Sequence, residues 1–119
     1  MIFFDSYAIL EIIRGNPNYR KFGDLTLITG TLNLAEVFYS LLKETGEKQA
    51  KKIIEKVKFE FIEISEAIAI RSSIFRYKNR SKKLSYTDCI GYITARKNNM
   101  RFLTGDQQFQ EMKHVLYVK

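Results

Sequence analysis

The chain has 119 residues, of which 45% are hydrophobic, 13% aromatic and 28% charged, with a formal net charge of +7. This composition excludes a chain that is mainly disordered, and the length predicts one domain over residues 1–119. No apolar run exceeds four residues, so no membrane-spanning segment, which takes about 20, is predicted. The single cysteine, Cys89, has no disulfide partner, and the simplest compartment is the cytoplasm.

The first half of the chain alternates short apolar stretches with segments of helical spacing. The predicted elements are strands at 2–4 and 25–29 and helices at 7–13, about 31–45 and 47–56. Gly15, Asn16 and Pro17 end the first helix. Thr31 or Asn33 is the expected cap of the second helix.

The second half continues this alternation. The predicted elements are strands at 57–65, 101–104 and 115–118, long helices at about 66–79 and 85–97, and a short helix after Asp106. The strongest strand signal is the period of two in residues 57–65. Strands that alternate with helices throughout predict an α/β fold with a mostly parallel central sheet.

Four carboxylates are predicted to meet at one edge of this sheet. Asp5 and Asp106 each end a strand, Glu36 lies near the start of the second helix, and Asp88 opens the helix before residues 101–104. In open parallel sheets, sites form beyond the carboxyl ends of the strands. Carboxylate oxygens suit Mg²⁺ or Mn²⁺, which lower the pKa of a bound water and stabilise charge on a phosphodiester.

Each acid taken alone can also be only a helix cap. Asp5 and Asp106 fit plain N-caps, while Asn33-x-x-Glu36 and Ser85-x-x-Asp88 fit capping boxes. Independent caps need not converge on one edge, however, so the set of four favours a shared site.

The sequence resembles the PIN-domain ribonucleases in three segments, in the order of that family. IFFDSYAIL looks like the family's opening strand, which ends in Asp followed by Ser or Thr. TLNLAEVFYSLL resembles its second motif, and LSYTDCIGYITARKNNMRFLTGDQQF resembles its C-terminal signature, an Asp-headed helix followed by a strand into Thr-x-Asp. The length suits the toxin of a VapBC-type toxin–antitoxin pair.

The resemblance implies a three-layer α/β/α fold and a metal-dependent endoribonuclease that is the toxin of a type II toxin–antitoxin pair. It further implies Mg²⁺ or Mn²⁺ as cofactor, RNA as substrate, a cognate antitoxin and a homodimer. The catalytic and metal-binding set would be Asp5, Glu36, Asp88 and Asp106. Ser6 and Thr104 match the family's hydroxyl positions, where they would orient carboxylates or waters.

The basic residues suggest how RNA would be held. Between Arg71 and Arg101 lie nine basic residues and one acid, Asp88. A solvated helix face explains such a run as well as RNA binding does. The residues we expect to follow phosphates are Arg76, Arg80, Lys82 and Lys83. Four tyrosines could stack on unpaired bases, Tyr39, Tyr77, Tyr86 and Tyr92, although packing is favoured for Tyr39 and Tyr92.

Three alternative functions would each leave a different mark on the sequence. A phosphoacceptor receiver domain needs an early acid pair, an Asp that ends the third strand and a late Lys, and the sequence lacks this pattern. A catalytically silent PIN-fold module that binds RNA or protein would be marked by the loss of one acid. A PIN nuclease of RNA processing or decay would commonly carry extra domains.

Overall fold

The computed structural model describes residues 1–119, with five strands, five α-helices and two short 3₁₀ helices. The strands are β1 (Ile2–Phe4), β2 (Leu27–Thr29), β3 (Phe59–Phe61), β4 (Arg101–Thr104) and β5 (Val115–Tyr117). The helices are α1 (Ser6–Ile13), η1 (Pro17–Phe22), α2 (Thr31–Thr45), α3 (Glu47–Glu55), α4 (Glu66–Lys78), α5 (Tyr86–Lys97) and η2 (Gln107–Phe109). None of the helices combines the length and the apolar composition that a bilayer span requires.

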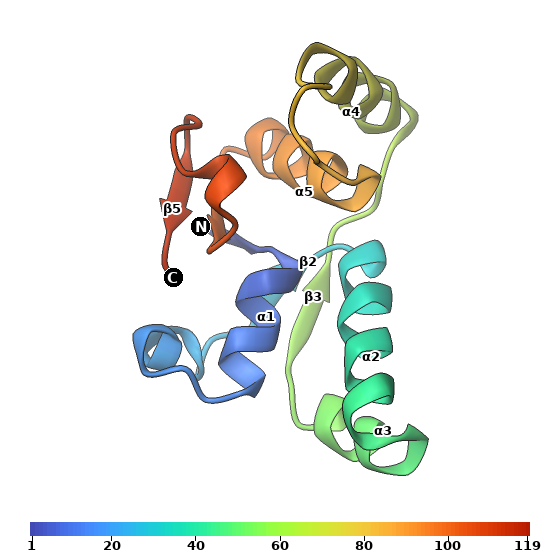
Figure 1. Ribbon diagram of the computed structural model, residues 1–119, viewed down its shortest axis with the longest axis vertical. Helices are drawn as coiled ribbons and strands as arrows, with labels where there is room; N and C mark the ends of the chain where they lie inside the picture. The colour runs from blue at the N-terminus through green and yellow to red at the C-terminus, as the bar shows by residue number, and fades with distance from the viewer.

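All five strands are parallel and lie in the order β3-β2-β1-β4-β5. Side chains alternate across the sheet, so that Phe3 and Phe4 enter different cores. The Phe4 core joins the sheet to α1, η1, α2 and α3, and the Phe3 core joins it to α5 and η2. Figure 1 shows these helices on either side of the central strands. The expected three-layer α/β/α fold with a parallel sheet is therefore confirmed.

Several predicted boundaries differ from the observed ones, in both strands and helices. The strand expected over 57–65 is restricted to β3, because its only neighbour, β2, offers three residues for pairing. Helix α2 begins at Thr31 with Gly30 as its N-cap, so neither Thr31 nor Asn33 is the cap. The 3₁₀ helix η1 was not predicted, although the break in helical structure at Gly15, Asn16 and Pro17, where η1 begins, was.

Helix α5 lies directly on the sheet, and α4 packs on α5 at one end of the molecule (Figure 1). Gly91 allows this close approach, because a Cβ there would lie 3.2 Å from the Phe3 ring and 3.3 Å from the Phe102 ring. Tyr92 is buried on α5, as expected, and so is Cys89. Tyr39 was expected to pack, but its side chain is 61% exposed.

Candidate active site

The sheet brings two of the predicted acids together at its carboxyl edge. Strands β1 and β4 pair in parallel with Phe4 opposite Leu103. Asp5 and Asp106 therefore both lie just after the carboxyl ends of two neighbouring strands. Asp88, the third residue of α5, joins them at a hollow of about 360 Å³. The hollow is lined by Asp5, Ser6, Tyr7, Asp88, Gly105, Asp106, Gln107 and Lys119.

Asp5 is the most deeply placed of these acids, with 3% of its surface exposed. Its Oδ2 accepts a hydrogen bond of 2.7 Å from the Thr104 hydroxyl, while its Oδ1 is buried and has no partner. Burial raises the pKa of Asp5 to about 7, with smaller contributions from the charges of Asp88 and Glu36, and the Thr104 hydrogen bond opposes this rise. The carboxyl group is thus held where ionisation is costly.

Asp88 is held in place by a capping box at the start of α5. Its Oδ2 accepts from the Ser85 backbone N–H at 2.8 Å, and its own N–H donates to the Ser85 hydroxyl at 3.0 Å. Burial raises the pKa of Asp88, the hydrogen bonds from Ser85 lower it, and the charges of Asp106 and Glu36 raise it. Asp88 is therefore both a cap and a member of the acidic set.

Asp106 is likewise both a helix cap, at the start of η2, and a member of the acidic set. Its Oδ1 accepts from the Gln108 backbone N–H at 3.0 Å. Its own N–H donates to the Thr104 hydroxyl at 3.1 Å. Thr104 therefore links Asp5 to the backbone of Asp106, in agreement with its predicted position beside the acids.

Glu36 is the sixth residue of α2 and reaches the other acids through Ser6. The Ser6 hydroxyl donates to Glu36 Oε1 at 2.7 Å and accepts from Asn33 Nδ2 at 3.0 Å. Asn33 is buried in this network, a role that the sequence did not suggest. The available signal was a polar residue three positions before Glu36 in an otherwise apolar helix start. Glu36 itself does not line the hollow.

None of the four acids forms a salt bridge, although Lys119 lines the same hollow. The only salt bridges in the structure join Arg14 to Glu44 and Lys51 to Glu47, away from this edge. The atoms that these acids offer to a metal ion are all carboxylate oxygens, and one of them is the unpartnered Oδ1 of Asp5. No three His, Cys, Asp or Glu side chains are gathered closely enough to enclose an ion. Mg²⁺ usually takes only one or two carboxylates and keeps several waters, so oxygens spaced this widely still suit such an ion.

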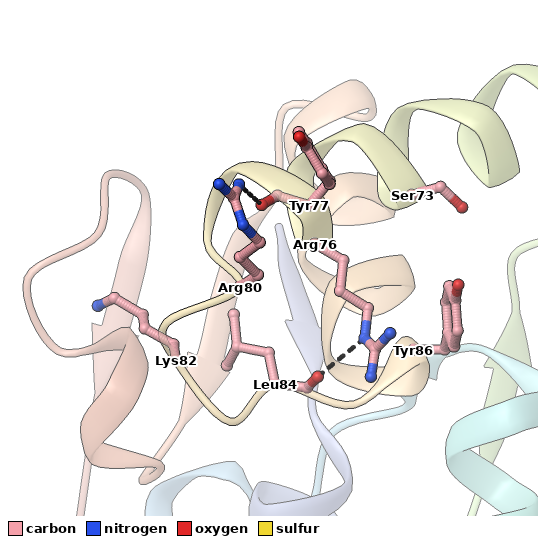
Figure 2. Close-up of a pocket in the computed structure, with 7 residues that line it drawn as sticks. All are labelled: Ser73, Arg76, Tyr77, Arg80, Lys82, Leu84 and Tyr86. Carbon is pink, nitrogen blue, oxygen red and sulfur yellow. Dashed lines mark hydrogen bonds between the residues drawn. The ribbon is translucent and has the colours of Figure 1, made fainter.

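The predicted basic residues lie at a separate place. Arg76, Arg80 and Lys82 line a second hollow between the end of α4 and the start of α5 (Figure 2). Lys83 does not line it, and its backbone N–H donates to the Gln108 side chain at 2.6 Å.

Solved structures with the same fold include three toxin or toxin–antitoxin structures. Mycobacterium tuberculosis VapC20, a sarcin-ricin loop cleaving toxin, superposes with a TM-score of 0.78 and 15% identity over 100% of both chains. A toxin–antitoxin complex from Klebsiella pneumoniae superposes with a TM-score of 0.75 and 21% identity, over 98% of this chain and 96% of that chain. VapBC2 from Rickettsia felis, bound to a DNA fragment from their promoter, superposes with a TM-score of 0.73 and 16% identity, over 98% of this chain and 97% of that chain.

At these identities the structural matches establish a shared fold. No curated protein sequence matches the chain significantly. The sequence profile of the PIN domain matches residues 2–115, which is nearly the entire chain. The chain therefore belongs to the PIN domain family.

Proposed function

We propose that this PIN domain is a metal-dependent endoribonuclease that hydrolyses RNA phosphodiester bonds and acts as the toxin of a type II toxin–antitoxin pair. The observation that carries the proposal is the acidic edge, where Asp5, Asp88 and Asp106 line one hollow without a salt bridge and one buried Asp5 oxygen has no partner. Similarity in fold to VapC20 and to toxin–antitoxin complexes supports it.

The residues that would hold Mg²⁺ or Mn²⁺ are Asp5, Glu36, Asp88 and Asp106. Such an ion lowers the pKa of a bound water and offsets negative charge on the phosphodiester. Asp5 must lose its proton before both of its oxygens can serve as ligands, because its pKa is raised to about 7.

Ser6 and Thr104 orient the carboxylates in this proposal. The Ser6 hydroxyl fixes one oxygen of Glu36, and Asn33 in turn fixes Ser6. The Thr104 hydroxyl fixes Asp5 Oδ2 and leaves Oδ1 available. Each acid thereby presents one oxygen to the protein while the other is left for a ligand, as is usual around metal sites.

A cognate antitoxin is the proposed protein partner. Exposed apolar surface is the usual mark of such an interface. An apolar groove of about 460 Å³ lies between α2 and β3, with Leu34, Phe38, Phe59 and Phe61 among its lining residues. The proposed homodimer would need another apolar face, and Ile70 and Ile74 on α4 are 55% and 49% exposed.

The activity is tested by incubating the purified protein with structured RNAs and Mn²⁺, beside an EDTA control. Cleavage is expected from the wild type and from Asp24→Asn, a variant at an exposed acid distant in sequence from the four. Cleavage should be lost with EDTA and in Asp5→Asn and Asp88→Asn. Full activity in both of these variants would contradict the assigned site. No cleavage of any RNA, with Mn²⁺ still bound, would favour the silent binding module.

A further inference from the structure

A second hollow, distinct from the acidic edge, lies between the end of α4, the loop 79–85 and the start of α5. It measures about 340 Å³ and is lined by Ser73, Arg76, Tyr77, Arg80, Lys82, Leu84 and Tyr86 (Figure 2). We call it the basic hollow, since three of its seven residues are cations and none is an acid.

The two arginines of the basic hollow are fixed by backbone carbonyls. Arg76 Nε donates to the Leu84 carbonyl at 3.0 Å, and Arg80 Nη1 donates to the Tyr77 carbonyl at 2.9 Å. Neither arginine forms a salt bridge, so their charges are not offset by any carboxylate. The remaining guanidinium N–H groups are free to bind an anion, and their planar arrangement suits phosphate.

Two exposed aromatic rings complete the hollow. The Arg76 guanidinium lies 4.3 Å from the centre of the Tyr86 ring, and that of Arg80 lies 4.4 Å from the centre of the Tyr77 ring. Tyr86 and Tyr77 are 54% and 66% exposed, so they contribute little to the core. Cations beside accessible rings are the groups that bind the phosphates and bases of unpaired nucleotides.

The basic hollow is connected to the acidic edge by the backbone. Tyr86 is the first residue of α5 and Asp88 the third, which places them only ~3 Å apart along the helix axis. On the other side, Lys82 Nζ donates to the Gln108 carbonyl at 3.1 Å, and the Gln108 N–H donates to Asp106 at 3.0 Å. The two places therefore lie on different faces of the start of α5, and an RNA strand that occupies both passes around this end of the helix.

We propose that the basic hollow binds an unpaired nucleotide of the RNA that flanks the bond cleaved at the acidic edge. Arg76 and Arg80 bind its phosphate and Tyr86 stacks on its base. This inference rests on the proposed ribonuclease function for its choice of RNA. It makes Arg76, Arg80 and Tyr86 binding residues that act apart from the four acids.

The charge component is tested by fluorescence anisotropy with a fluorescein-labelled 12-nucleotide single-stranded RNA in EDTA. Arg76→Gln/Arg80→Gln is expected to weaken binding at least about tenfold, and to reduce the log–log salt slope by roughly 0.7 for the one phosphate that is no longer bound. The matched control is Lys48→Gln/Lys52→Gln, two exposed lysines on α3, far from the basic hollow (Figure 1). Equal weakening in both double variants would overturn the proposal.

The stacking component is tested with Tyr86. Tyr86→Leu should weaken binding of the single strand about five- to twentyfold, in the range measured for one base–aromatic stack, and Tyr86→Phe should retain it. Wild-type affinity in Tyr86→Leu would overturn the stacking role. Arg80→Gln alone and Tyr86→Leu keep the test valid if loss of the Arg76–Leu84 hydrogen bond prevents folding, which circular dichroism would reveal.

The remaining measurements separate this inference from the proposed function. If the wild type cleaves RNA while the variants of the basic hollow bind RNA normally, the basic hollow is overturned and the nuclease stands. If the wild type does not cleave but the variants lose RNA binding, the nuclease fails and the basic hollow stands. Displacement of the RNA by poly-L-glutamate as effectively as by unlabelled RNA of equal charge would overturn the proposal in favour of an acidic protein ligand.

Discussion

Asp5 illustrates how one side chain can be costly for folding and useful for binding. Its carboxyl group is buried, one oxygen has no partner, and the neighbouring charges come from other acids. A buried carboxylate in such surroundings is stabilised by protonation or by a cation. The proposed metal site and the raised pKa of Asp5 therefore have the same origin.

The stability of the protein without divalent cations should depend on pH through Asp5. Its pKa rises from 3.8 to about 7 on folding, so the folded state binds this proton more tightly. The resulting stability is fully present below pH 3.8 and is lost as the pH rises through 7. In EDTA, the free energy of unfolding should fall between pH 4 and 8 by roughly 4 kcal/mol more than in Asp5→Asn.

Urea titrations of both proteins at several pH values measure this difference directly. Carboxyl groups that do not interact with Asp5 contribute equally to both curves and cancel. Asp24→Asn should follow the wild type, because Asp24 is exposed. Parallel curves for the wild type and Asp5→Asn would show that Asp5 ionises normally in the folded protein.

Thr104 should set the pH range of cleavage. Its hydroxyl donates to Asp5 and thereby lowers the pKa of that group. Thr104→Val removes the donor at nearly constant size, so the pKa of Asp5 rises and the acidic limb of the pH–rate profile should move up by about one unit. Thr104→Ser retains the hydroxyl and should keep the wild-type profile. An unmoved acidic limb in Thr104→Val would contradict this role.

The sequence predicted these individual residues unequally well. The meeting of Asp5 and Asp106 followed from the parallel topology alone, and Ser6 and Thr104 followed from the resemblance. Asn33 was interpreted as a cap, because its burial depends on where α2 meets α1, which no local pattern encodes. Local pattern predicts which groups are present, whereas tertiary packing decides what they contact.

At the level of elements, the capping box of α5 joins helix stability to the site. Ser85→Ala removes the hydroxyl that accepts the Asp88 N–H and should lower the free energy of unfolding by about 1 kcal/mol. The Asp88 carboxylate is held by the Ser85 backbone N–H. Loss of the other half of the box loosens this turn, so cleavage should fall further than the loss of stability explains. The measurement is chemical unfolding and cleavage rate on the same samples.

Ser65 provides the matched control for this prediction. It is the N-cap of α4 and accepts a hydrogen bond from the Ile68 N–H at 3.2 Å. Ser65→Ala should therefore lose a similar amount of stability and retain cleavage. Equal cleavage in Ser65→Ala and Ser85→Ala would indicate that the capping box acts on stability alone.

The strands that the sequence predicted least well are β2 and β3, whose bounds are set by how they pair with each other. The alternation in residues 57–65 indicates strand propensity, but pairing with the short β2 limits β3 to Phe59–Phe61. Strand β4 was predicted with its observed bounds, and β1 and β5 together pair with its whole length. Helix spans agreed to within one or two residues because their caps and breakers are local.

Across the whole molecule, charge is separated between one acidic edge and a basic remainder. The four acids carry −4, and the other nine acids with twenty bases leave +11 elsewhere. Without a cation the acids repel one another, as their mutual effects on pKa indicate. A divalent cation relieves this repulsion in the folded state only, because the unfolded chain does not hold the acids together.

Mn²⁺ or Mg²⁺ should therefore stabilise the protein against heat. At a free ion concentration 100 times Kd the gain is about 2.7 kcal/mol, which for a domain of this size raises Tm by roughly 10 °C. The increase should be smaller at pH 5 than at pH 8, because protons compete for Asp5, whose pKa is about 7. Differential scanning calorimetry at matched ionic strength measures both effects. Sodium chloride at the same ionic strength should not reproduce them, and an equal rise of Tm in Asp5→Asn/Asp88→Asn would place the bound ion elsewhere on the molecule.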